Sequence, residues 1–161
     1  MSEGITSPFS EPARSGPRDA VLRPRLAIGL IAAFATAKLL VHLITIAATP
    51  YGIHRDEFLY LAMGQHLRFW GMDFPPAIAV LAKIARSLFG DTLFAVRFPP
   101  AIAGTLLLVT TGLITRELGG GRFAQGLAMF SLFAGPLFLR PASLFQPVVW
   151  DQLSWTLGFF A

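Results

Sequence analysis

LAIGLIAAFATAKLLVHLITIAA, residues 26–48, is the most informative stretch of this sequence, because it is apolar apart from Lys38 and His42. About 20 apolar residues cross a bilayer, whereas the apolar core of a cleavable signal has about 7–15. The stretch therefore predicts a first membrane span that is retained. Lys38 and His42 are four residues apart and share a helix face. We expect them to point into the protein or toward a polar lipid group, since a charge in mid-bilayer is costly.

The composition of the whole chain also predicts a membrane protein. Of its 161 residues, 54% are hydrophobic and 14% are charged, against about 45–50% and about 25% in soluble proteins. The net charge is +4, but the arginines are dispersed at the ends of apolar segments, which excludes nucleic acid as a partner. The absence of cysteine excludes disulfides, a zinc-thiolate site and a cysteine nucleophile.

Residues 1–25 are rich in Ser, Pro, Gly and Arg, a composition that predicts a disordered tail. Four arginines precede the first span: Arg14, Arg18, Arg23 and Arg25. By the positive-inside rule the tail is then cytoplasmic, and the loop from residue 49 lies outside the cell's inner (plasma) membrane.

Residues 26–161 are predicted to form one all-α membrane module of about four spans. Further spans are expected at about 95–115, 123–139 and 148–161. Arg116 and Arg122 flank a glycine-rich turn between the second and third spans, which agrees with a cytoplasmic hairpin. The fourth apolar segment stops short of a full span, so we expect a truncated protein that is inactive by itself.

The outer loop, residues 49–94, is predicted to contain two helices that lie against the bilayer. Pro75-Pro76 separates a helix at about 56–70 from one at about 76–89, because the residue before a proline avoids helical geometry. Lys83 and Arg86 are three residues apart on the second helix, with apolar residues around them, as in an interfacial helix.

Candidate chemistry is concentrated in Tyr51-Gly-Ile-His-Arg-Asp-Glu57, where the chain leaves the first span. Asp56 and Glu57 have two interpretations that do not exclude each other. They can cap the following helix and interact with its dipole. A carboxylate there can also accept a proton from an acceptor hydroxyl while a cation holds an anionic leaving group.

Several motifs in order resemble one enzyme family. They are His54-Arg-Asp-Glu-Phe-Leu-Tyr60, Gly71-Met-Asp-Phe-Pro-Pro76, Phe89-Gly90, Ala95-Val-Arg97 and Leu144-Phe-Gln-Pro-Val-Val-Trp-Asp-Gln-Leu-Ser-Trp155. This set resembles the amino-terminal part of the polyprenyl-phosphate-sugar-dependent glycosyltransferases of the GT-C fold, in glycosyltransferase family 39. That family includes protein O-mannosyltransferases and bacterial aminoarabinose transferases. The resemblance covers residues 51–161.

The resemblance implies transfer of a sugar from a polyprenyl-phosphate donor to a hydroxyl of a lipid, glycan or protein at the outer face of the membrane. Asp56 matches the family's acidic residue in the first loop, which acts as base or orients the acceptor, and Glu57 completes the pair. The family usually inverts at the anomeric carbon. Asp151 would be a second catalytic acid facing the same outer cavity as Asp56; a helix cap or an ion pair with Arg140 also explains it.

The resemblance also suggests a substrate-binding set made of His54, Arg55, Tyr60, Arg97 and Gln146. Arg55 would contact the donor phosphate, and Arg97 would either hold the outer loop against the core or contact the same phosphate. A topology charge explains Arg55 equally well, and an interfacial anchor explains Arg97 equally well. Phe74 stands where several relatives have a cation before the double proline, so that phosphate contact is lost. His54 most simply forms hydrogen bonds, and Tyr60 first fits the interfacial aromatic belt. No cofactor is indicated, and a divalent metal stays an open alternative.

Two other functions fit the sequence. A small membrane subunit without catalytic activity would use the outer loop to dock a partner. A transporter or flippase would use Lys38, His42 and Asp151 as buried polar residues, and it predicts broken helices, which the sequence does not reveal.

Overall fold

The computed structural model describes residues 24–68, 70–71 and 74–161, and these are helical, with no strands among them. The all-α prediction is confirmed. The predicted tail lies outside the described residues except for Pro24 and Arg25, as do Phe69, Met72 and Asp73. The helices are α1 (Ile28–Ala48), α2 (Arg55–Gln65), α3 (Pro76–Phe89), α4 (Leu93–Glu117), α5 (Arg122–Ala134), α6 (Pro136–Leu139), the 3-10 turn η1 (Pro141–Ser143) and α7 (Pro147–Phe160).

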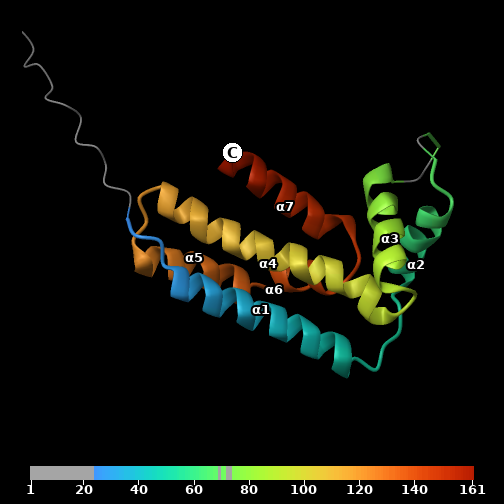
Figure 1. Ribbon diagram of the computed structural model, residues 1–161, viewed down its shortest axis with the longest axis horizontal. Coiled ribbons are helices and arrows are strands. Elements are labelled where there is room, and N and C mark those ends of the chain that lie inside the picture. The colour runs from blue at the N-terminus through green and yellow to red at the C-terminus, as the bar shows by residue number, and fades with distance from the viewer. Residues whose placement is uncertain (1–23, 69, 72–73) are drawn as a thin grey trace, which may run out of the picture.

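Two of these helices, α1 and α4, are long and apolar enough to cross a membrane. They pack side by side, with α5 and α7 also against α4 (Figure 1). The buried residues of α1 are Lys38 and His42, while Leu40 and Ile44 are exposed. This polar-inside, apolar-outside arrangement is the reverse of a water-soluble helix and fits a helix in lipid.

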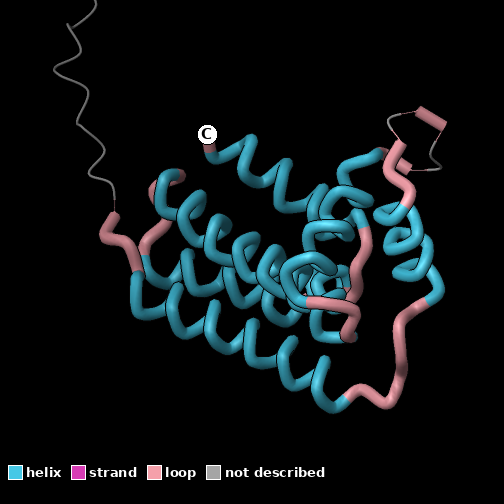
Figure 2. The backbone as a smooth tube through the Cα atoms, turned by 45° about the vertical axis from the view of Figure 1, so that its right-hand side comes forward, coloured by secondary structure: helices cyan, strands magenta, loops and turns pink. Residues whose placement is uncertain are grey.

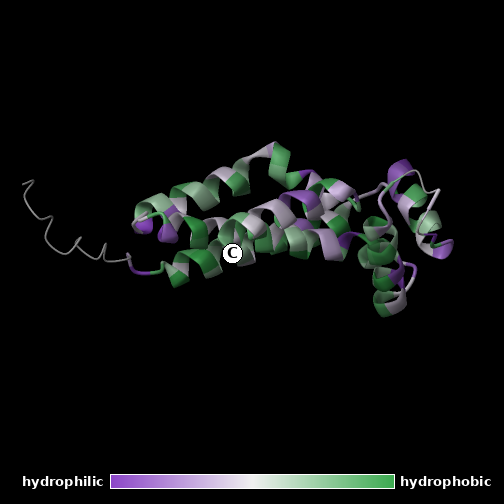
Figure 3. Cartoon of the chain, turned by 90° about the horizontal axis from the view of Figure 1, so that it is seen from above, coloured by the Kyte–Doolittle hydropathy of each residue, from purple (hydrophilic) through white to green (hydrophobic). Residues whose placement is uncertain are grey.

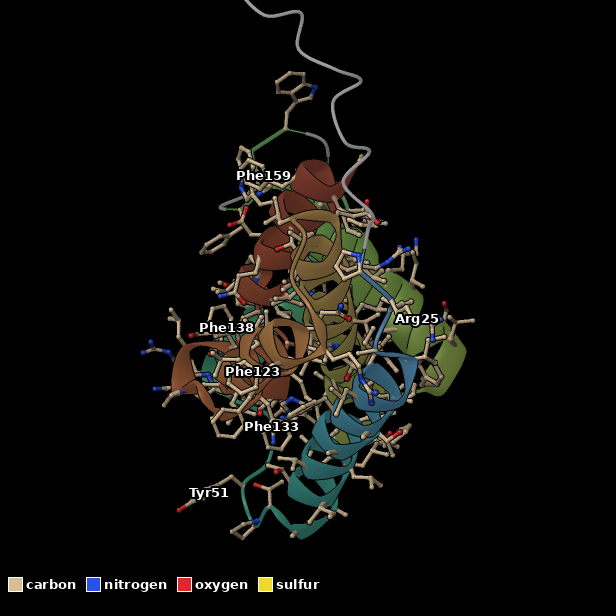
Figure 4. The ribbon with its side chains drawn as sticks, turned by 90° about the vertical axis from the view of Figure 1, so that its left-hand side faces the viewer. Arg25, Tyr51, Phe123, Phe133, Phe138 and Phe159 are labelled. Atoms are coloured by element: carbon tan, nitrogen blue, oxygen red, sulfur yellow. The ribbon has the colours of Figure 1, made fainter. Side chains whose placement is uncertain are left out.

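The outer surface of the bundle is apolar as well. Figure 3 shows hydrophobic residues along the helices, with hydrophilic residues mainly toward the two ends. Figure 4 looks along the helices and shows Phe159 extending outward from the bundle; Phe159 and Phe123 are both more than four-fifths exposed, at 82% and 83%. An apolar patch of this extent on a folded chain indicates contact with lipid or with further protein.

The third span predicted over residues 123–139 is not one continuous helix. The chain instead forms α5 and then bends by 73° into Pro136–Ser143, so that the pair is either a broken span or a re-entrant segment. The reason is Pro136, which has no N–H to donate to the carbonyl of Leu132 and ends the helix there. The break also corrects the expectation that broken helices are lacking from this chain.

The four predicted spans are not confirmed. The structure has two candidate spans, or three if the bent pair counts as one. The fourth segment, predicted at 148–161, forms α7 over 14 residues, a length of about 21 Å at 1.5 Å per residue. A bilayer core is about 30 Å thick.

The helices α2 and α3 lie together at one end of the bundle, which we call the α2–α3 end (Figures 1 and 2). The bounds of α3 equal the range expected from the sequence, and its axis runs across the bundle (Figure 1). The helix α2 is shorter than the range 56–70 predicted for the first outer-loop helix, and it ends at Gln65. Gly71, between α2 and α3, has a φ of 75°, a backbone conformation that glycine adopts without strain.

Gln125 forms hydrogen bonds that join the start of the first span to the α4–α5 turn, at the end of the bundle opposite the α2–α3 end. It is buried, and its amide accepts from the N–H of Ala27 (2.9 Å) and donates to the carbonyls of Arg25 (3.2 Å) and Gly120 (2.9 Å). These bonds place the start of the first span beside the hairpin. This agrees with the predicted hairpin topology, and the cytoplasmic side assigned to this end stays a prediction.

We expect Gln125→Leu to lower the free energy of unfolding by about 1–3 kcal/mol, because three backbone groups lose their partner. Gln152→Leu is the matched control. It removes an amide oxygen that has no hydrogen-bond partner in the described part of the chain, so it should be neutral or stabilising. Denaturant unfolding in detergent measures both, and equal losses in the two variants would contradict the assignment.

Gly104 allows α4 to approach the turn after α6. A Cβ at this position would lie 2.4 Å from the Cβ of Ala142, so Gly104→Ala should cost about 1–3 kcal/mol through overpacking. Adding Ala142→Gly should restore most of that loss in the same unfolding measurement. Gly126→Ala, whose Cβ would meet its nearest neighbour at an ordinary 3.6 Å, should cost nothing. A loss in Gly126→Ala as large as that in Gly104→Ala would contradict the close-approach explanation.

Candidate functional site

The acidic pair Asp56 and Glu57 lies in the first turn of α2, and the start of this helix carries a capping box. The Nδ1 atom of His54 accepts from the N–H of Asp56 (3.3 Å), while Glu57 Oε2 accepts from the N–H of His54 (2.7 Å). The capping role predicted from the sequence is therefore present for Glu57, whereas the N-cap side chain is that of His54 and not that of Asp56. Because His54 Nδ1 already accepts a hydrogen bond, it has no proton to offer Asp56 Oδ2, which lies 3.7 Å away.

Glu57 points into the protein and is 0% exposed. Its carboxylate accepts from Arg97 Nε (3.2 Å), Arg97 Nη2 (3.0 Å), the N–H of His54 (2.7 Å) and the N–H of Phe145 (2.9 Å). Arg97 Nη2 also donates to the carbonyl of Gly52 (3.0 Å). One carboxylate thus joins α2, α4, the loop after α1 and the segment before α7.

This geometry favours a positioning role for Glu57 over a catalytic one. A carboxylate that already accepts four hydrogen bonds can take a proton from a substrate only by giving up a bond inside the core. Arg97 serves the same purpose from α4, as a fork that fits a carboxylate at two points. The expectation that Arg97 holds the loop against the core therefore fits its contacts.

Asp56 lies on the other side of the same helix turn, and its side chain is 38% exposed. Its neighbour Arg55 is 93% exposed, with Nε 3.4 Å from Asp56 Oδ1. An ion pair this open contributes little to stability. Asp56 thus keeps lone pairs accessible to a ligand, so the structure gives the two adjacent acids different surroundings.

A cavity of about 520 Å³ opens beside this helix start, between the end of α1 and the segment before α7. His54, Arg55 and Arg97 contribute to its lining, together with the hydroxyl-bearing Thr45, Thr49, Tyr51 and Ser143. Positive groups beside hydroxyls are suited to an anionic, oxygen-rich ligand such as a phosphate or a sugar phosphate.

Asp151 lines a different cavity from the one that contains His54, Arg55 and Arg97. This second cavity, of about 240 Å³, lies between α3 and α7, and its walls include Ile78, Leu81 and Trp150. The sequence led us to expect Asp151 and Asp56 around one cavity. The structure separates them because Asp151 lies one turn into α7, where it lines the cavity against α3.

The two other predicted substrate-binding residues, Tyr60 and Gln146, are less exposed than Arg55. Tyr60 is buried, with its ring edge-to-face against Phe74 at 5.3 Å between centroids. Burial raises the pKa of the Tyr60 hydroxyl, and the negative charge of Asp56 raises it further, so the hydroxyl stays protonated. Gln146 is half-buried at the start of α7, where its side chain forms no cap hydrogen bond.

Arg86 forms an ion pair that the sequence analysis did not anticipate. Its Nε donates to the carboxylate of Asp91, and this hydrogen bond is the main reason why the pKa of Asp91 lies below its usual value. The pair closes the turn between α3 and α4. Arg86 is therefore engaged in the fold, beyond the interfacial role predicted for it.

The described residues contain no group of three or more His, Asp or Glu side chains that could hold a metal ion. Comparisons of the chain with protein-family models, with curated proteins and with solved structures found no match. The resemblance to glycosyltransferases thus stays a prediction based on the motifs alone, and the site has to be interpreted from its own geometry.

Proposed function

We propose that this chain forms part of a membrane glycosyltransferase that transfers a sugar from a polyprenyl-phosphate donor to an acceptor hydroxyl, with Asp56 as the base. One observation carries the proposal. Of two adjacent acids, Glu57 is enclosed by Arg97 and two backbone N–H groups, and Asp56 is left accessible beside two residues that line the large cavity.

The chemistry of transfer needs an accessible carboxylate, which is Asp56, and cations, which the neighbouring cavity offers in Arg55 and Arg97. The acceptor oxygen has to lose a proton as it attacks the anomeric carbon, and an accessible carboxylate can take it. The departing lipid phosphate carries its own negative charge, so it needs cations and not a proton donor. Arg55 is open to solvent, and the Nη1 of Arg97 has no hydrogen-bond partner within the described residues.

The proposed partners follow from this reaction. They are a polyprenyl-phosphate sugar, the lipid bilayer that holds its chain, and a hydroxyl acceptor on a lipid, glycan or protein at the outer face. The apolar helices beside a polar cavity support such a substrate, since its chain stays in lipid while its headgroup reaches the α2–α3 end.

The test uses the protein expressed from its complete coding sequence in cell membranes. Polyprenyl phosphate carrying a radiolabelled sugar is supplied, and the label is followed into lipid, glycan and protein fractions. We expect transfer above the level of matched membranes without the protein. Equal transfer with and without the protein, across several sugars, would reject the proposal.

A second candidate, a transporter or flippase, is favoured by the break between α5 and α6, because transporters build their sites at discontinuous helices. Lys38 and His42 are buried beside this break. Sealed vesicles discriminate the two functions: accumulation or flipping of the lipid-linked sugar without any sugar transfer would favour the transporter. A subunit without catalytic activity is the third alternative, and it predicts that replacing Asp56 leaves activity unchanged.

A further inference from the structure

The break between α5 and α6 leaves two backbone carbonyls without their usual helical donors. The carbonyl of Leu132 would accept from the N–H of residue 136, which is a proline. The carbonyl of Phe138 belongs to the last turn of α6, where the helix has no further N–H to offer. In an apolar bundle each such group needs another partner.

Lys38 of α1 supplies that partner. Its Nζ lies 3.3 Å from the carbonyl oxygen of Leu132 and 3.4 Å from that of Phe138, so one ammonium group joins the two sides of the break. The side chain is 0% exposed, and α1 lies against α5 and η1 (Figure 1). Because Lys38 is fully buried, it does not contact a polar lipid group, which was one of the two alternatives predicted from the sequence.

His42, one turn further along α1, holds the same segment at a second point. Its Nδ1 lies 3.2 Å from Ser143 Oγ, and that hydroxyl donates its only hydrogen to the carbonyl of Leu139 (3.0 Å). The Ser143 hydroxyl thus contacts the His42 imidazole of α1 as well as a carbonyl of its own segment. Lys38 and His42 together hold residues 136–143 against the first span, α1.

Residues 136–143 lead directly to the candidate site. Ser143 and Leu144 line the 520 Å³ cavity, and the N–H of Phe145 bonds to Glu57. The direction in which the chain leaves the break therefore sets one wall of the cavity and one of the four contacts of the buried carboxylate.

We propose that Lys38 is a positioning residue for this cavity, and that its ammonium group takes the place of the backbone donor that Pro136 lacks. Loss of the ammonium frees residues 136–144 to move while the rest of the bundle stays folded. The inference concerns the shape of the cavity and holds for any reaction in it, so it can fail or succeed independently of the proposed function.

The absence of cysteine from this chain makes the inference directly measurable. Leu144→Cys introduces one thiol in the cavity wall, and the rate at which a maleimide labels it in the detergent-solubilised protein reports its accessibility. We expect Lys38→Met to raise the labelling rate by about tenfold or more, because two hydrogen bonds from a charged donor are lost. Lys38→Arg keeps a charged donor and should stay within about threefold of the parent.

Two further arms separate local from global effects. Leu40→Met puts the same residue on the exposed side of α1 and should change nothing. A second reporter, Leu108→Cys, lies in α4 at a position that is 0% exposed, and it should label equally slowly in all variants if the rest of the bundle stays folded. Pro136→Ala restores a donor for Leu132, so Lys38→Met should have a smaller effect in that background. The inference is overturned by unchanged labelling in Lys38→Met, by equal increases at both reporters, or by Lys38→Arg behaving like Lys38→Met.

Discussion

Replacing Arg97 by methionine should destabilise the protein by about 3–5 kcal/mol, a loss that prevents accumulation of many folded proteins. The guanidinium of Arg97 is the only cation that the structure gives to the buried Glu57 within the described residues. Removing it leaves a carboxylate in the core with two backbone N–H groups as its remaining partners. A buried ion costs far more without its counter-ion than the pair contributes as a whole.

The double variant separates the cost of the lone charge from the value of the pair. Glu57→Gln combined with Arg97→Met removes both charges and keeps side chains of similar length, so most of the loss should be recovered. Arg55→Met is the matched control, since Arg55 is 93% exposed and should change stability by no more than about 0.5 kcal/mol. Denaturant unfolding in detergent measures all four proteins. Equal effects of Arg97→Met and Arg55→Met would contradict the burial argument.

The sequence was sufficient to predict α1 and α3 because their signals are local. The apolar stretch at 26–48 and the double proline Pro75-Pro76 act through neighbouring residues, and the structure has α1 and α3 at those places. The inward direction of Lys38 and His42 also follows from the cost of a charge in lipid. The partners of Lys38 could not be predicted, since Leu132 and Phe138 offer backbone carbonyls, which every residue has.

The break after α5 was visible in the sequence as Gly135-Pro136, but hydropathy alone favoured one continuous span. A proline in a membrane helix is compatible with a mild kink or with a sharp bend, depending on what satisfies the freed carbonyl. Here that partner comes from a lysine 94 residues away in the chain. Only the tertiary structure decides between the two outcomes.

The different surroundings of Asp56 and Glu57 are likewise a tertiary property. Adjacent helical residues point about 100° apart, so the sequence shows that one of them can face inward without showing which. Arg97 is 40 residues from Glu57 and Phe145 is 88 residues away. These contacts select Glu57 for the core, and Asp56 is left accessible at the surface.

Asp56→Asn should lower kcat/KM for sugar transfer by about 10²–10⁴-fold, the usual contribution of a positioned general base. The amide has nearly the same size and can still accept a hydrogen bond, but it cannot take the proton of the acceptor hydroxyl. The fold should be unaffected, because His54 bonds to the backbone N–H of residue 56 and the exposed contact with Arg55 contributes little. Activity and stability should therefore separate in this variant.

Asp91→Asn provides the matched control, since Asp91 is an exposed acid in the α3–α4 turn whose partner is Arg86. It should transfer sugar at close to the wild-type rate, whereas Asp56→Asn should unfold at the wild-type denaturant concentration and transfer almost none. Initial rates with radiolabelled donor and unfolding curves in the same detergent measure both quantities. Wild-type turnover by Asp56→Asn would remove its role as base and favour a subunit without catalytic activity. Parallel losses of activity and stability would make Asp56 a structural residue like Glu57.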